Sequence, residues 1–153
     1  MDLEFNLFGD KEMEQVMDAL PERMQKNVLA AAVRGGASTI SKAAKVNIKA
    51  DGTVRTGLLH KSITIKVKRY TRDGVIYAAV GASRRVIGTT VNGRRIVPAN
   101  YAHLVEHGTR TSRAKPFLRP ALDANRKAVF DGMTRRARKG LAREIVKLRR
   151  ATA

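Results

Sequence analysis

Between residues 21 and about 50, hydrophobic positions recur at three- and four-residue steps, which is the spacing of one face of an α-helix. Many residues on that face are small, and Gly35 and Gly36 fall in its middle. Each glycine weakens a helix by roughly 1 kcal/mol relative to alanine. The glycine pair therefore either bends the helix or lets another backbone approach closely, and the small-residue face packs against a sheet or a second helix. A shorter helical turn is predicted over residues 11–20.

After residue 52 the period changes from that of a helix to that of a strand. Ile63, Ile65 and Val67 alternate with polar residues, as expected for a strand with one buried face. Asp73 and Gly74 then supply turn chemistry, and residues 75–80 return as a second strand. These two strands are the predicted nucleus of the sheet.

A second hairpin is predicted within residues 83–100. Residues 86–91 and 94–97 flank Asn92-Gly93, the strongest short hairpin signal in the chain. Four arginines decorate it: Arg84, Arg85, Arg94 and Arg95. A hairpin with marginal stability of its own needs a surface to lie on, so it either projects to a partner or forms a simple surface loop.

The last predicted element is one long helix from residue 120 to about 150. An apolar stripe runs along it through Leu122, Val129 or Phe130, Met133, Ala137, Leu141, Ile145 and Leu148. Basic residues cover the remaining surface, among them Arg135, Arg136, Arg138 and Lys139. At 1.5 Å per residue this helix would be about 45 Å long, so its distal half packs on another subunit or stands at the surface of an assembly.

These elements predict a domain of the α+β or α/β class. It has a long N-terminal helix, a small mainly antiparallel sheet with two hairpins, and the basic C-terminal helix packed on the sheet. With 153 residues, of which 43% are hydrophobic, the whole chain is expected to form one domain with a modest core.

Composition excludes several classes of protein. The chain has no cysteine, so disulfides and thiolate metal sites are excluded. No apolar run approaches the roughly 20 residues that span a bilayer, and the acidic N-terminus is unlike a secretory signal. We therefore expect no contact with a membrane.

Charge is large and unevenly placed. The chain carries 31 Lys and Arg against 13 Asp and Glu, a formal net charge of +18, yet residues 1–22 hold seven acids and only one lysine. This acidic N-terminal arm either contacts another copy of the basic body or is a solvated face. The basic body itself needs counter-charge from nucleic acid, an acidic neighbour or salt.

Catalytic and cofactor motifs are weak. His103, Glu106 and His107 form an H-x-x-E-H pattern, which in a helix could hold zinc, but Gly108 ends any helix directly after it. There is no Gly-x-Ser-x-Gly elbow, and His60 beside Lys61 and Ser62 has no visible third catalytic partner. No phosphate-cradling glycine loop follows a strand. We expect no enzyme activity, no cofactor and no metal, and Glu106 either pairs with an arginine or caps a backbone turn.

The run from Tyr101 to Leu122, YAHLVEHGTRTSRAKPFLRPAL, combines an apolar segment, a glycine break, a basic connector and a proline-braced helix entry. Pro116 and Pro120 restrict the backbone before and at the start of the last helix, so that Phe117 and Leu118 enter a core. Upstream, residues 56–63 read Thr-Gly-Leu-Leu-His-Lys-Ser-Ile. The residues expected to carry this structural role are Thr56, Gly57, Leu58, Tyr101, Glu106, Gly108, Thr109, Pro116, Phe117, Leu118 and Pro120.

Together the two pieces resemble a family of tailed-phage neck and tail-completion proteins, the gene-product-ten-like tail components of lambdoid siphophages. The resemblance implies a structural virion protein made in the host cytoplasm. It implies a homo-oligomeric ring, six copies by family, between the head-tail connector and the tail-terminator or tail-tube proteins, around the DNA channel. Contacts to partners or packaged DNA would then fall to Arg84, Arg85, Arg94, Arg95, Arg135, Arg136, Arg138 and Lys139. The alternative is a sequence-independent nucleic-acid-binding protein of nucleoid or ribosomal type, which the charge alone favours.

Overall fold

The computed structural model describes residue 15 and residues 17–50, 56–69, 75–89 and 92–151. The chain divides into two compact units, each built from separate segments. The first unit contains residues 1–37, 67–78 and 127–153, and the second contains residues 38–66 and 79–126. Of the helical turn predicted over residues 11–20, Gln15, Met17 and Asp18 are helical, whereas residues 11–14 and 16 lie outside the described residues, as does the predicted turn at Asp73-Gly74.

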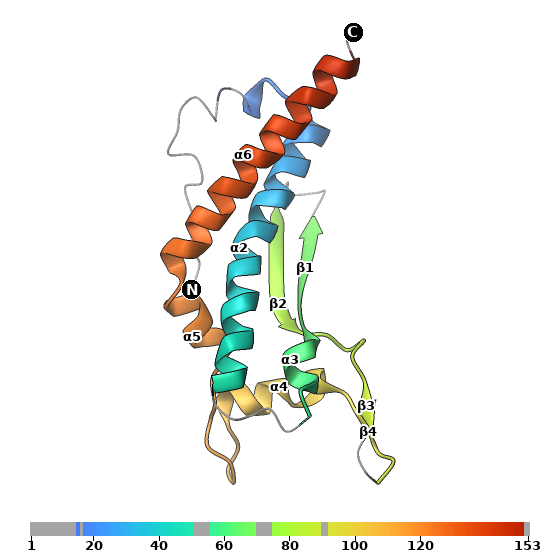
Figure 1. Cartoon of the computed structure of the whole chain (residues 1–153), viewed down its shortest axis with the longest axis vertical. Coiled ribbons are helices and arrows are strands. Elements are labelled where there is room, and N and C mark those ends of the chain that lie inside the picture. The colour runs from blue at the N-terminus through green and yellow to red at the C-terminus, as the bar shows by residue number, and fades with distance from the viewer. Residues whose placement is uncertain (1–14, 16, 51–55, 70–74, 90–91, 152–153) are drawn as a thin grey trace. The chain divides into compact units, whose positions relative to one another are not determined.

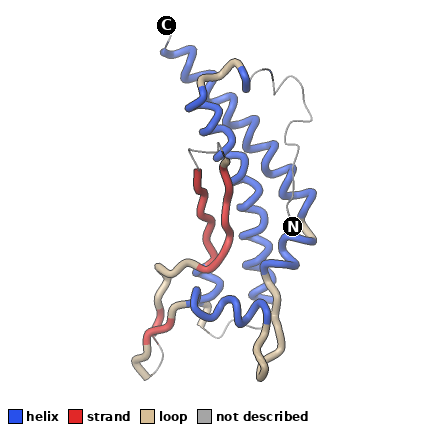
Figure 2. The backbone as a smooth tube through the Cα atoms, turned by 180° about the vertical axis from the view of Figure 1, so that it is seen from behind, coloured by secondary structure: helices blue, strands red, loops and turns tan. Residues whose placement is uncertain are grey.

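Helices dominate the described chain, and the fold is α+β, as predicted (Figure 1). The long N-terminal helix is α2 (Glu22–Ala50), and β1 (Ile63–Arg69) pairs with β2 (Ile76–Ala82) in a two-stranded antiparallel sheet. Figure 2 shows the short pair formed by β3 (Gly88–Thr89) and β4 (Arg95–Ile96) as separate from it. The remaining helices are α3 (Leu58–Ser62), α4 (Pro98–His107), α5 (Leu118–Asp123) and α6 (Arg126–Ala151).

In the first unit, the N-terminal half of α2 packs on α6. Val28 and Ala32 of α2 share a buried cluster with Ala137 of α6. Around the glycine pair the helices come so close that a Cβ atom on Gly35 would lie 2.6 Å from the carbonyl oxygen of Gly132. Of the two roles considered for the glycines, the structure shows the close approach of a second backbone.

Gly35→Ala is expected to destabilise the protein although alanine is the better helix former. The added methyl group would meet the backbone of α6, and such overpacking outweighs the propensity gain, for a net loss of about 2 kcal/mol. Gly140→Ala is the matched control, because its Cβ would lie 3.4 Å from Val28 Cα, an ordinary contact, and should stabilise by up to about 1 kcal/mol. Chemical denaturation followed by circular dichroism measures both. Equal stability of the two variants would contradict the close helix contact.

In the second unit, the C-terminal half of α2 packs with α3, α4 and α5 around one cluster. Ala44 and Ile48 of α2 are buried there with Leu59, Ile63 and Phe117, and Ala121 completes the set. This core contains residues from both sequence pieces that were expected to carry the structural role.

The second hairpin is present, but its paired part is shorter than predicted and its register differs. Gly88 pairs with Ile96 and Thr89 with Arg95, so five residues, 90–94, separate the strands. A two-residue Asn92-Gly93 turn would instead pair Thr89 with Ile96. The strand predicted over residues 94–97 stops early because α4 begins at Pro98, whose ring suits the first turn of a helix and cannot continue a ladder.

The single helix predicted over residues 120–150 is two helices, α5 and α6, and the first of them already begins at Leu118. The break lies at Ala124 and Asn125. There the Asn125 side-chain amide donates to the carbonyl oxygen of Ala121 at 2.9 Å, which is a local alternative to the backbone bonds of a continuing helix. The predicted apolar stripe is confirmed for Val129, Met133 and Ala137, which are buried.

No helix in the described part of the chain combines the length and the apolarity that crossing a membrane requires.

Candidate functional site

The carboxylate of Glu106 joins α4 to α5 in the second unit. Its Oε2 accepts hydrogen bonds from the backbone N–H groups of Phe117 at 2.8 Å and Leu118 at 3.0 Å, and Oε1 accepts from Arg119 at 2.9 Å. Glu106 is only 9% exposed. The first N–H groups of a helix have no partner within the helix and carry partial positive charge, so an anion there is favourable. Of the two roles expected for Glu106, the geometry is that of a cap.

The segment between α4 and α5 is folded back on itself. Gly108 ends α4 at a φ of 76°, and a Cβ on it would lie 2.7 Å from the backbone nitrogen of Ala114. Thr109 Oγ1 accepts from the N–H of Ser112 at 3.0 Å. The N–H of Lys115 donates to the carbonyl oxygen of Val105 at 2.8 Å. Gly108 and Thr109 thus turn the chain back toward α4, where the backbone N–H groups of residues 117–119 donate to Glu106.

Phe117 is the residue that this turn places in the core. It is 1% exposed, and its carbonyl oxygen accepts a hydrogen bond from the side-chain amide of Asn47 at 3.1 Å. Tyr101 packs at the edge of the same cluster, where burial raises the pKa of its hydroxyl. The neighbouring Pro116 and Pro120 are exposed, so they shape the backbone without entering the core.

The upstream piece shapes α3. Gly57 precedes the helix at a φ of 67°, a left-handed conformation that favours glycine, and the N–H of Leu58 donates to Thr56 Oγ1 at 3.5 Å. The Leu58 side chain covers Gly88 so closely that a Cβ atom there would overlap Leu58 Cδ1. Since α3 also packs against α4, the two motif pieces and the short hairpin all meet in the second unit.

The H-x-x-E-H pattern does not bring its three side chains to one point. Both carboxylate oxygens of Glu106 are occupied by backbone amides, and His103 and His107 are exposed. Within the described ranges, no group of three or more His, Asp or Glu side chains is arranged to hold a metal ion.

The basic residues expected to contact partners or DNA fall into two groups. Arg84, Arg85, Arg94 and Arg95 lie exposed beside or on the short hairpin in the second unit. The other four lie on α6 in the first unit. Among those four, Arg136 differs, because its side-chain stem lies against Gly35 of α2.

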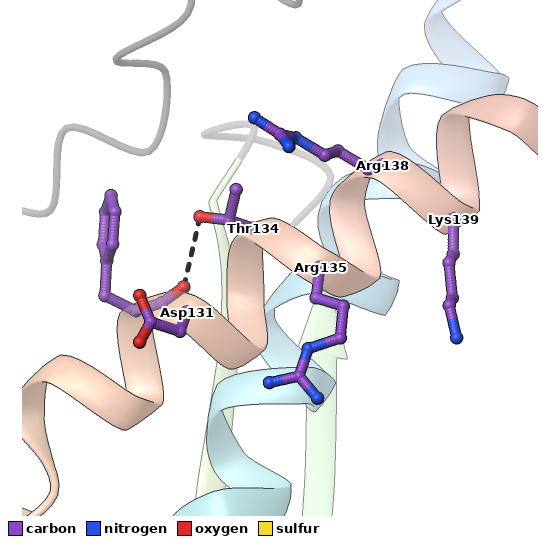
Figure 3. Close-up of a pocket in the computed structure, with 6 residues that line it drawn as sticks. Asp131, Thr134, Arg135, Arg138 and Lys139 are labelled. Carbon is purple, nitrogen blue, oxygen red and sulfur yellow. Dashed lines mark hydrogen bonds between the residues drawn. The ribbon is translucent and has the colours of Figure 1, made fainter.

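On α6, Arg135, Arg138 and Lys139 line an open groove of about 430 Å³ with Phe130, Asp131 and Thr134 (Figure 3). Arg135 and Lys139 point to one side of the helix and Arg138 to the other. The Thr134 hydroxyl donates to the carbonyl oxygen of Phe130 at 3.2 Å. The groove therefore presents three cations around a small, partly apolar floor.

Sequence reasoning missed the roles of Asn47 and Glu144, and it considered His60 only as a catalytic candidate. Asn47 shows no pattern that points to the Phe117 carbonyl, and the buried Glu144, which pairs with Lys147 at 2.8 Å, falls between stripe residues of α6. His60 lies among cations: partial burial, followed by Lys49, Lys45 and Lys61, lowers the pKa of its imidazole. The i, i+3 spacing of Glu144 and Lys147 was a usable signal.

Comparison with known proteins gave one family match. A family model described as "Bacteriophage HK97-gp10, putative tail-component" matches residues 11–108, well over half of the chain. Searches of curated proteins and of solved structures found no match. The matched range contains α3, the short hairpin and α4 with Glu106, while α5 and α6 follow it.

Proposed function

Because the chain belongs to the HK97-gp10-like family of bacteriophage tail components, we propose that it is a neck or tail-completion protein of a tailed phage or prophage. Copies of it would form a homo-oligomeric ring, six by family resemblance, between the head-tail connector and the tail-terminator or tail-tube proteins. It would be made in the host cytoplasm and act without catalysis or cofactor. The family match is the observation that carries this proposal.

The geometry of the second unit supports a role as a building block. Glu106, Phe117 and Leu58 bind α3, α4, α5 and the short hairpin together, and each holds a backbone or a core position. None of these contacts presents a nucleophile or a general base to solvent. A rigid junction that carries an exposed basic hairpin suits a subunit that joins neighbours through its surface.

The exposed cations support contacts beyond the subunit. Arg84, Arg85, Arg94 and Arg95 lie exposed at or beside the short hairpin, where they can meet acidic neighbours or the phosphates of DNA in a central channel. Contact with phosphates would be independent of base sequence.

Disrupting the gene in its phage is expected to leave filled heads and finished tails that do not join, because the ring that connects them is missing. Electron microscopy of the lysate measures this, and the wild-type gene supplied in trans should restore whole particles. The variant Arg94→Glu/Arg95→Glu should fold but fail to restore them, since reversed charges repel an acidic neighbour.

Lys68→Glu/Arg69→Glu is the matched control, because both residues are exposed at the end of β1 and belong to the first unit, whereas the short hairpin belongs to the second. It should restore particles. Normal particles without the gene would overturn the proposed function. Normal particles with the Arg94/Arg95 variant would show that the hairpin arginines are not needed for joining heads to tails. Tight binding of purified protein to duplex DNA, with no joining defect in the phage, would instead favour a nucleoid-type protein.

A further inference from the structure

Helix α6 has two faces of different chemistry. One face is buried through Val129, Met133, Ala137, Gly140 and Glu144. The other, here called the outer face, consists of the linings of two open grooves, of about 430 and 370 Å³. The second groove is lined by Ala142, Arg143, Val146, Lys147 and Arg150. Because its residues follow those of the first groove at four-residue steps, the two grooves form one continuous surface.

The outer face is cationic and also partly apolar. Three basic side chains line each groove, and Asp131 is the one acid among the described lining residues. Between the cations lie Phe130, Ala142 and Val146, and Val146 is 48% exposed. A phosphate backbone would use the cations but gains nothing from an exposed valine. A protein segment that interleaves acidic with apolar residues would use both.

The first fourteen residues of this chain have that composition. They hold five acids and a single lysine, and Met1, Leu3 and Phe5 alternate with Asp2 and Glu4. Fully extended, fourteen residues span up to about 48 Å. The 26 residues of α6 span about 39 Å, so the segment is long enough to follow both grooves.

We propose that residues 1–14 of one copy dock on the outer face of α6 of a second copy. This inference rests on the proposed assembly into a ring, for which it supplies a contact between neighbours. Copies with a formal charge of +18 repel one another, so each contact between them needs local counter-charge. An acidic segment from the adjacent copy provides it, and such a head-to-tail contact is heterologous, the kind that closes rings. Docking on its own α6 would neutralise the face without joining copies.

Cross-linking tests this directly, because the chain has no cysteine of its own. One full-length variant carries Asn6→Cys in the acidic segment, and another carries Ala142→Cys in the second groove; neither change alters charge. The two are mixed, treated with a short bismaleimide and separated on a denaturing gel. We expect an adduct of twice the chain mass. Val46→Cys, at an exposed position of α2 in the second unit, replaces Ala142→Cys in the control mixture and should give little adduct.

Charge reversal then identifies what holds the contact. Adding Arg135→Glu/Arg143→Glu to the Ala142→Cys chain should lower the adduct yield by about tenfold. Combining that chain with an Asn6→Cys partner that carries Asp2→Lys/Glu4→Lys should restore the yield. A duplex DNA ligand would not show this rescue.

Each remaining outcome is decisive. An adduct that forms only within one chain carrying both cysteines would overturn docking on a second copy. An adduct yield that does not change on charge reversal would overturn the docking as well. So would a yield that the reversed partner does not restore, if duplex DNA binding is lost in the same variant. Rings seen by electron microscopy without any adduct would reject this inference alone, whereas the absence of rings in the particle neck would reject the proposed function with it.

Discussion

Replacing Glu106 with alanine is expected to lower the free energy of unfolding by about 3 kcal/mol, because three backbone donors lose their acceptor at once. The N–H of Phe117 lies in a buried position, where water does not easily replace the carboxylate. The N–H groups of Leu118 and Arg119 are half-buried and recover part of their hydrogen bonding from water. Chemical denaturation measures the change.

Glu106→Gln separates the charge and acceptor number from the size of the side chain. The amide has one acceptor oxygen, and its NH₂ group faces an N–H donor, so it cannot serve all three backbone groups. We expect an intermediate loss of about 1 to 2 kcal/mol. Asp131→Asn, at an exposed acid of α6, should change stability by less than about 0.5 kcal/mol.

A chelator distinguishes the cap from a metal ligand. If Glu106 acts as a cap, EDTA leaves the melting temperature of the wild-type protein unchanged, and the loss in Glu106→Ala is the same with and without zinc. A wild-type protein that EDTA destabilises as strongly as the substitution does would restore the H-x-x-E-H zinc hypothesis. Stability of Glu106→Ala within about 0.5 kcal/mol of wild type would show that the cap contributes nothing.

Periodicity predicted the elements whose burial is one-sided. Helix α2 and strand β1 were placed within one or two residues of their observed bounds, because an apolar face repeats along each of them. The same periodicity predicted the buried stripe of α6. It also left two roles open for Gly35 and Gly36, because periodicity does not reveal which other segment packs against these glycines.

Predictions failed where a single local side chain or a tertiary contact sets the backbone. The helix breaks at Asn125, whose side-chain amide donates to the carbonyl oxygen of Ala121. The spacing of apolar residues gives no sign of this break. In the second hairpin, Asn92-Gly93 carries the strongest turn chemistry, but Gly88 is held against Leu58 and Pro98 starts α4, so the register is set from outside the turn. Tertiary contacts there outweighed local preference.

The sequence identified many residues of the candidate site but not which of them contact one another or share a surface. The cap of Glu106 on residues 117–119 spans eleven to thirteen residues, and spacing alone left an arginine pair as an equal choice. Asn47, seventy residues from Phe117, gave no signal at all. The eight candidate basic residues share a charge, yet they separate between two units, because net charge carries no information on which cations share a surface.

Phe117→Ala is expected to cost about 3 to 5 kcal/mol, the range for removing a fully buried aromatic side chain. The ring fills the cluster that joins α2, α3, β1 and α5, so its loss leaves a cavity lined by residues from all four elements. Phe117→Leu keeps most of the volume and should cost less than half as much. Leu104→Ala, at a 44% exposed position of α4 in the same unit, should cost less than about 1 kcal/mol.

Hydrogen exchange locates the effect. The backbone hydrogen bonds from Phe117, Leu118 and Arg119 to Glu106 depend on the ring that holds the turn in place, so protection of these amides should fall more in Phe117→Ala than in Leu104→Ala. Asn47→Ala removes only the hydrogen bond to the Phe117 carbonyl and should give a smaller change of the same kind. A loss below about 1 kcal/mol in Phe117→Ala, with these amides still protected, would mean that the cap holds the turn without the aromatic side chain.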